Sequence, residues 1–140
     1  MATLTVTYKP TIGAVRDYLR TVPELVAQVG TRIYVGGLPK NPANPVLPAV
    51  VVTRVGGAMV PPVDQALVQF DCWATTGSAA EQLAVSVAGV LDSTPGSTLL
   101  TTGVRFKGAQ ITSVNWLPDP ASDLPRYIVT AQVVAATTSP

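Results

Sequence analysis

The sequence contains no histidine, and it holds a single cysteine. Without histidine, catalytic triads and dyads that use an imidazole base, and zinc sites of the usual kind, are excluded. One cysteine cannot form a disulfide within the chain, and Cys72 has no histidine partner to activate it as a nucleophile. We therefore expect Cys72 to be a buried, unreactive thiol in the middle of a strand.

Charged residues are also scarce. They make up 12% of the chain, against 47% hydrophobic residues, and the formal net charge is +1. That share of charge is about half the usual one for a globular protein, and no basic patch indicates a nucleic-acid-binding surface. A surface with so little charge suits a subunit that packs against copies of itself. Compositional drift in a chain rich in Ala, Val and Thr is the alternative explanation.

Long apolar runs and phosphate-binding motifs are missing as well. No apolar run approaches the roughly 18 residues of a membrane span, and the opening M-A-T-L-T-V-T-Y lacks the regions of a signal peptide. We therefore expect assembly in the cytoplasm and no contact with a membrane. The chain contains neither a G-x-S-x-G elbow nor a G-K-[ST] loop.

Carboxylates are the remaining route to catalysis or metal binding. Asp64 and Asp71 are seven positions apart, an odd spacing, so in one regular strand they project to opposite faces. Asp119 and Asp123 share a turn with Ser122 and offer oxygens to a cation, but the turn lacks the spacing of a calcium loop. We predict no catalytic residue, no cofactor and no metal site, and hence a protein that is not an enzyme.

The strongest local pattern runs from Ala66 to Ser93. Its first part alternates like a strand, with one face formed by Val68, Phe70, Cys72 and Ala74. After Thr76-Gly77-Ser78 the period becomes helical, with a stripe formed by Ala80, Leu83, Ala84, Val87, Val90 and Leu91. Ser78 and Glu81 have the spacing of a capping box and predict the start of this helix.

The segment before residue 31 is predicted to be an extended arm followed by helix. Thr3–Tyr8 alternates threonine with apolar residues, as a strand does. Thr11 is the expected N-cap of a helix from Ile12 to about Thr21. A short second helical piece, Glu24–Val29, ends at Gly30 as its C-cap.

Strands and rigid loops follow. Thr31–Val35 is a short predicted strand, and Gly36–Leu47 is a stiff loop with prolines in and just after it. Ala49–Val55 is rich in β-branched residues and is predicted to be a strand buried on both faces. Gly56-Gly57 is expected to end that strand, and Ala58–Val63 to form a second loop.

The last part of the chain is predicted to be a pair of strands. Thr94–Gly103 is a polar linker, and Val104–Leu117 is a long strand whose change of parity predicts a bulge near Gly108. A turn at residues 118–124 leads to a last strand over Pro125–Ala136. Residues 137–140 form a loose tail.

These elements predict one α+β domain over residues 1–140, including an extended arm at residues 1–10. The expected order is helix, strand, strand, strand, helix, strand, strand. We expect a mainly antiparallel sheet of about four to five strands, with two helices packed on one face and the other face solvated or covered by a neighbour.

Candidate interface positions come from the arm, the two loops and the last turn. They are Leu4, Val6, Tyr8, Pro39, Asn41, Pro42, Asn44, Pro45, Met59, Pro61, Pro62, Asp119 and Asp123. Trp73 and Trp116 are expected to anchor the core or an interface.

The segments together resemble the tail terminator (tail-completion) proteins of long, non-contractile-tailed bacteriophages (siphophages). The resemblance spans about Val22 to Val134 and includes V-P-E-L-V-A-Q-V-G-T-R-I-Y, the proline-rich loop and L-P-A-V-V-V. Its most specific piece is V-Q-F-D-C-W-A with the helix A-A-E-Q-L-A-V-S-V, and a closing pair of strands completes it. The arm and the spaced prolines of the long loop depart from the family's pattern.

The resemblance implies a structural virion protein of the neck region of the tail, assembled in the host cytoplasm. Such proteins form a hexameric ring that caps the head-proximal end of the tail tube and stops its polymerisation. The implied partners are copies of the chain, the tail tube protein and the head-completion (stopper) protein. DNA would pass through the lumen without specific binding, which suits a net charge of +1.

Other classes of function stay open. The chain is also compatible with another phage neck or tail component, such as a stopper or a tube-like protein. A small-molecule binding module with a pocket between helix and sheet is a further alternative. An enzyme is the third, although no residues of the sequence indicate one.

Overall fold

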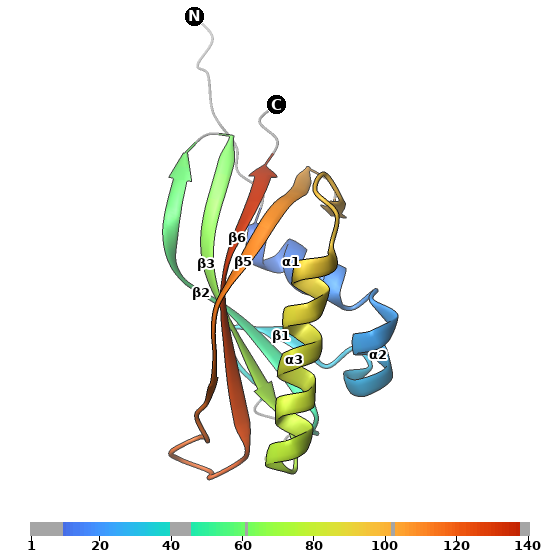
Figure 1. The fold of residues 1–140 in the computed structure, drawn as a ribbon, viewed down its shortest axis with the longest axis vertical. Coiled ribbons are helices and arrows are strands. Elements are labelled where there is room, and N and C mark those ends of the chain that lie inside the picture. The colour runs from blue at the N-terminus through green and yellow to red at the C-terminus, as the bar shows by residue number, and fades with distance from the viewer. Residues whose placement is uncertain (1–9, 40–45, 61, 102, 138–140) are drawn as a thin grey trace, which may run out of the picture.

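The computed structural model describes residues 10–39, 46–60, 62–101 and 103–137. They form one six-stranded sheet with three helices on one side of it (Figure 1). The strand order is β1-β2-β3-β6-β5-β4, and the sheet is strongly twisted along its length. No helix within the described residues has both the length and the apolarity needed to cross a bilayer.

The elements have the following bounds. The helices are α1 (Thr11–Leu19), α2 (Pro23–Val29) and α3 (Gly77–Ser93). The strands are β1 (Ile33–Val35), β2 (Ala49–Val60), β3 (Val63–Trp73), β4 (Leu99–Thr101), β5 (Val104–Trp116) and β6 (Arg126–Thr137).

The predicted fold class is wrong in its number of elements and in its sheet type. The sheet has six strands and is mixed, because β1 runs parallel to β2, with Ile33 opposite Val50. There are three helices, because the short piece opened by Pro23 is a helix of its own. The strand that sequence patterns missed is β4, which lies in the predicted linker at Thr94–Gly103. Its three residues are too few to show a period.

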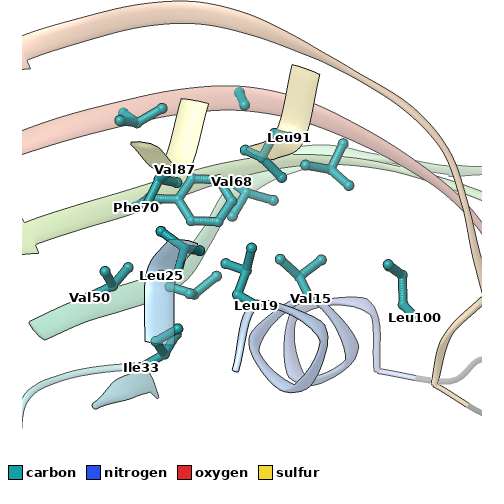
Figure 2. Close-up of a cluster of buried hydrophobic side chains, with 14 of the residues drawn as sticks. Val15, Leu19, Leu25, Ile33, Val50, Val68, Phe70, Val87, Leu91 and Leu100 are labelled. Carbon is teal, nitrogen blue, oxygen red and sulfur yellow. The ribbon is translucent and has the colours of Figure 1, made fainter. Parts of the chain in front are cut away.

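One hydrophobic core lies between the helices and the sheet (Figure 2). Helices α1, α2 and α3 contribute Val15, Leu19, Leu25, Leu83, Val87 and Leu91, among others. The sheet contributes alternate residues of its strands, such as Val50, Val68, Phe70, Val129 and Val133. Phe70 is fully buried at the centre, so its truncation to alanine should cost about 3–5 kcal/mol.

Strand β2 is longer than predicted. Gly56-Gly57 does not end it, and the loop expected at Ala58–Val63 is instead the end of β2 and a tight hairpin into β3. A bulge interrupts the pairing between Arg54 and Gly56. A Cβ atom at Gly57 would lie 2.0 Å from the Gln65 carbonyl oxygen, so glycine here marks a close backbone approach rather than a strand end.

The burial predicted for this strand is correct only for its first part. Ala49–Val52 is buried on both faces, whereas the residues from Thr53 onward are half-buried or exposed. The apolar character of Val55 therefore does not indicate core packing, since this side chain is exposed.

The bulge predicted near Gly108 is confirmed. The register of β5 against β6 shifts between Phe106 and Gly108, and it shifts a second time between Ile111 and Ser113. The two bulges keep Ala109, Ile111 and Val114 on the helix side of β5, although their spacing is irregular.

Both predicted helix starts are displaced. The N-cap of α3 is Thr76, whose hydroxyl oxygen accepts a hydrogen bond of 3.1 Å from the Ala79 backbone amide, and not Ser78. Glu81 accepts a hydrogen bond from Tyr127 instead of completing a capping box. Thr11 is the first residue of α1 rather than its cap. Gly30 is the C-cap of α2, as predicted.

Candidate assembly interface

Among the described residues, strand β2 has an open edge beyond β1. The short strand β1 pairs with β2 only from Val50 to Val52, and Gly36 adds a backbone hydrogen bond to the Val52 carbonyl. From Arg54 to Val60, none of the described residues pairs with this side of β2. Val55, Met59 and Val60 are exposed there. A strand edge with unpaired backbone groups and exposed apolar side chains can pair with a strand of another chain.

Strand β5 lies near the opposite edge of the sheet, and within the part of the chain that the structure describes it also has an open edge. Beside it runs a surface groove of about 510 Å³ between β5 and α3. The groove is lined by Val85, Ala88, Gly89, Asp92, Ala109, Gln110, Ile111 and Val114. Val85 and Val114 are 56% and 41% exposed, so apolar side chains are accessible in its walls, and Asp92 and Gln110 add polar groups.

A second groove of about 370 Å³ lies on the outer side of the helical layer, between α1, α2 and α3. Its walls include Tyr18, Val22, Glu24 and Ser86. The Gln28 amide donates a hydrogen bond of 2.9 Å to the Ser86 hydroxyl and ties α2 to α3 beside the groove. The polar groups at its rim and its open form offer a shallow surface rather than an enclosed ligand cavity.

The sheet face away from the helices carries a cluster of Trp73, Asp71 and Arg126. The Arg126 guanidinium lies 5.0 Å from the centre of the Trp73 ring and 3.8 Å from an Asp71 carboxylate oxygen. Burial raises the pKa of Asp71, although a hydrogen bond from Gln69 and the charge of Arg126 act in the opposite direction. Trp73 is thus buried although none of the described helices lies above it, which agrees with its predicted role as an anchor of the core or an interface.

A second carboxylate, Asp64, joins α1 to the β2–β3 hairpin. Its Oδ2 atom accepts hydrogen bonds of 2.6 Å from the Thr11 hydroxyl and 2.7 Å from the Arg54 guanidinium. Burial by itself would raise the pKa of Asp64, but the two donors outweigh it and hold the pKa below its ordinary value. The predicted separation holds, since Asp64 lies on the core side of β3 and Asp71 on the other. The two carboxylates therefore form no catalytic pair.

The predicted interface residues fall into two groups. Leu4, Val6, Tyr8, Asn41, Pro42, Asn44, Pro45 and Pro61 lie outside the described residues. Pro39 and Pro62 are exposed, as is Met59 near the end of β2. The structure brings Met59 and Pro62 together on the β2–β3 hairpin, and a contact surface at that end of the sheet stays a prediction.

The last predicted positions, Asp119 and Asp123, belong to the turn between β5 and β6. The Asp119 carboxylate accepts hydrogen bonds from the backbone amide and the hydroxyl of Ser122. These donors lower the pKa of Asp119. Asp123 has a positive φ of 57° and donates its backbone amide to the Asp119 carbonyl. Asp119 thus serves to shape the turn, while Asp123 stays exposed.

The described residues form neither a metal site nor a reactive cysteine. Among them, no three His, Cys, Asp or Glu side chains gather closely enough to hold a metal ion. Cys72 is fully buried, as predicted, and burial raises the pKa of its thiol far above the ordinary value. A thiol in this environment stays protonated and unreactive at neutral pH.

The groove between α3 and β5 was missed from the sequence. Val85 lies on the side of α3 away from the predicted stripe, so its period gave no reason to single it out. Ile111 departs from the parity of β5, and that irregularity was the one available signal. Which helix lies beside which strand edge depends on tertiary packing.

The comparisons with known proteins find one matching family and a similar fold. The family model described as "Tail completion protein gp17" matches residues 13–136. A chain from a structure titled "Virion of native gene transfer agent (GTA) particle" is similar in fold, with a TM-score of 0.62 and 19% sequence identity. The similarity covers 90% of this chain and 94% of that chain. No curated protein matches the sequence.

Proposed function

The chain belongs to the tail completion protein gp17 family, and from this premise we propose that it is a tail terminator, a ring that caps the head-proximal end of a phage tail tube. The family match over residues 13–136 is the observation that carries the proposal. The coarser part of this function, a structural role in a phage tail, follows from the family itself.

The two open strand edges give each copy two different surfaces for contacts with neighbours, which supports a ring rather than a dimer. They lie toward opposite sides of the sheet, at β2 and at β5, and they differ in sequence and surroundings. A contact that joins two different surfaces of the same protein is heterologous, and it produces a ring when the rotation closes. The low charge of the chain, 12% of residues, favours close packing between copies.

In this proposal the ring stops polymerisation of the tube and joins it to the head-completion (stopper) protein. The exposed β2–β3 hairpin, with Met59 and Pro62, and Pro39 of the proline-rich loop are its contact points with neighbours. A net charge of +1 gives a passing DNA duplex little electrostatic attraction to the ring.

We further propose that the ring has no catalytic role. The carboxylates of Asp64 and Asp71 lie on opposite faces of β3, and the Cys72 thiol is inaccessible. An active site needs such groups to converge on one accessible cleft.

The test is the mass of the purified protein in solution, measured by light scattering after size exclusion, alone and with its tail tube protein. A closed oligomer would support the proposal, as would a monomer that assembles only on tube ends and halts their growth. A matched reaction without the protein gives the length that tubes reach unhindered.

Two outcomes would contradict the terminator role. Polymerisation of the protein alone into long tubes would make it a tube-like component. A monomer that neither assembles nor binds the tube would redirect the search to small-molecule binding, tested by thermal shift with a panel of cofactors.

A further inference from the structure

The outer edge of β5 is covered only at its beginning. Strand β4 pairs with Val104 and Arg105, and the backbone of Phe106 bonds to Ser97 and Thr98. From Lys107 to Trp116, no described residue pairs with β5 on the side away from β6. This leaves a row of unpaired amides and carbonyls beside the 510 Å³ groove.

The groove and the open edge together have the form of a site for an added strand. A strand laid along β5 would send every second side chain toward the helix side of the sheet. Those side chains would enter the space between Ala109, Ile111 and Val114 on β5 and Val85 and Ala88 on α3. Backbone hydrogen bonds to an edge provide affinity in this mode of binding, and the groove provides specificity.

The bulges of β5 determine what kind of strand fits. They interrupt the pairing with β6 after Phe106 and after Ile111, and they bend the edge. Such bending works against pairing with the long, straight edge of another sheet. A short, single segment can follow the bend, because it has no neighbouring strands to hold it straight.

The chain itself contains a segment of this kind. Thr3–Tyr8 lies outside the described residues and alternates threonine with Leu4, Val6 and Tyr8. As a strand it would present three apolar side chains on one face and three threonines on the other. The apolar face matches the groove, and the threonine face matches the far side of β5, where Ser113 and Asn115 lie.

Tyr8, the apolar residue of the segment nearest Thr11, is too close to Thr11 to lie beside Ile111 of its own copy, so all three apolar residues cannot enter that groove together. Thr11 is held at Asp64 on β3, and Tyr8 precedes Thr11 by three residues, a reach of about 11 Å. A strand added beside Ile111 would lie three strand spacings across from Asp64 and about four residues along, roughly 19 Å in total. A neighbouring copy can bring its groove to the segment without this limit.

We propose that Thr3–Tyr8 of one copy adds as a strand to the open edge of β5 in the next copy, with Leu4, Val6 and Tyr8 in its groove. This inference rests on the ring proposed above, and it identifies one of the contacts that would hold the ring together. It also gives the contact a direction around the ring, since an arm on one side of a subunit meets a groove on the next.

The test is disulfide formation in the full-length protein under mild oxidation. Val114→Cys places a thiol in the groove, and it is combined in turn with cysteine at each position from 3 to 8. Cys72 adds no background, because it is buried and its thiol stays protonated. We expect covalent dimers and larger products for cysteines at Leu4, Val6 or Tyr8, and background yields for the matched cysteines at Thr3, Thr5 and Thr7.

Each outcome decides between the proposals. Equal or absent cross-linking in a protein that still forms rings would overturn the arm contact and leave the ring proposal standing. Cross-links only within single chains would overturn it in favour of a segment folded on its own copy. A protein that forms no ring, alone or on tubes, would overturn both. Deletion of residues 2–9 gives a second check, since we expect ring mass to be lost and an unchanged ring would contradict the proposal.

Discussion

At the scale of single residues, two aspartates on one strand have opposite environments. Asp64 is buried against two donors, Thr11 and Arg54, which favour its charged form. Asp71 lies on the other face of β3, where burial disfavours its charge more than Gln69 and Arg126 favour it. Identical side chains therefore contribute to stability with opposite dependence on pH.

The variants Asp64→Asn and Asp71→Asn test this contrast. At pH 7, Asp64→Asn should lower the free energy of unfolding by about 1–3 kcal/mol, because charge-assisted hydrogen bonds to Thr11 and Arg54 are weakened. The folded pKa of Asp64 is lowered, so its contribution is present above an unfolded pKa of about 3.9 and is lost as the pH falls through the folded pKa. The cost of the substitution should therefore shrink between pH 5 and pH 2, measured by urea unfolding.

Asp71→Asn is the matched control. The folded pKa of Asp71 is raised, so its charge destabilises the fold at neutral pH and this cost disappears as the pH falls through the folded pKa. The substitution should be nearly neutral or stabilising at pH 7 and become less favourable in acid. Parallel pH profiles for the two variants would contradict the assignment.

At the scale of elements, the structural role of a glycine or a helix cap depends on the residues packed around it. Gly57 lies in the middle of the β2–β3 hairpin with φ of 98°, whereas Gly89 lies on the exposed side of α3 with no heavy atom within 4 Å of an added Cβ. The first position needs glycine because of the adjacent backbone of Gln65, and the second does not.

Gly57→Ala should destabilise the protein, and Gly89→Ala should stabilise it. The first substitution places a Cβ 2.0 Å from the Gln65 carbonyl and forces an unfavourable φ, at a cost of at least about 1–3 kcal/mol. The second replaces a flexible glycine within a helix by alanine, which loses less backbone entropy on folding. It should raise the free energy of unfolding by about 0.5–1 kcal/mol. Thermal unfolding of both variants, side by side, measures the difference. A Gly57→Ala protein as stable as the wild type would contradict the close approach of Gly57 to the Gln65 backbone.

The start of α3 gives a second element-scale prediction. Thr76→Ala should cost about 1 kcal/mol, because the Ala79 amide loses its acceptor. Ser78→Ala, at the position that sequence spacing favoured as the cap, should change stability by less than about 0.5 kcal/mol. Chemical denaturation ranks the two variants. The reverse ranking would restore Ser78 as the cap.

At the scale of the whole molecule, assembly depends on surfaces that no single element defines. Within the described residues, the open edges of β2 and β5 are separated by β3 and β6, so the molecule has two different sides. This arrangement also exposes the protein to uncontrolled pairing, which the bulges in both strands reduce by bending the edges.

Met59→Lys tests the β2 edge as an interface. Lysine on an exposed edge opposes strand pairing and close apolar contact, so ring mass should fall while the circular dichroism spectrum stays unchanged. Val26→Lys on α2 is the matched control, since Val26 is 39% exposed and Met59 41%. Light scattering compares the two. Rings formed equally well by both variants would remove Met59 from the interface.

The sequence by itself determined the elements that have a clear period and enough length to show it. The face of β3 with Phe70 and Cys72, the body of α3 and the bulge near Gly108 all follow from local spacing. The lack of histidine likewise excludes imidazole chemistry whatever the fold, because it is a property of composition alone. The periodic features depend only on residues close together in the chain.

Only the tertiary structure decided the features that join distant segments. The strands β1 and β4 form their hydrogen bonds with β2 and β5. Because each of the two has only three residues, the local sequence does not indicate this pairing. Gly57 is confined by Gln65 across the hairpin, and Thr11 finds its acceptor 53 residues away in Asp64. The groove beside β5 exists because α3 packs along that edge. Local propensity specifies the backbone conformation of each segment. Contacts between remote segments decide where each helix and strand ends, which residue caps it and which surfaces stay exposed.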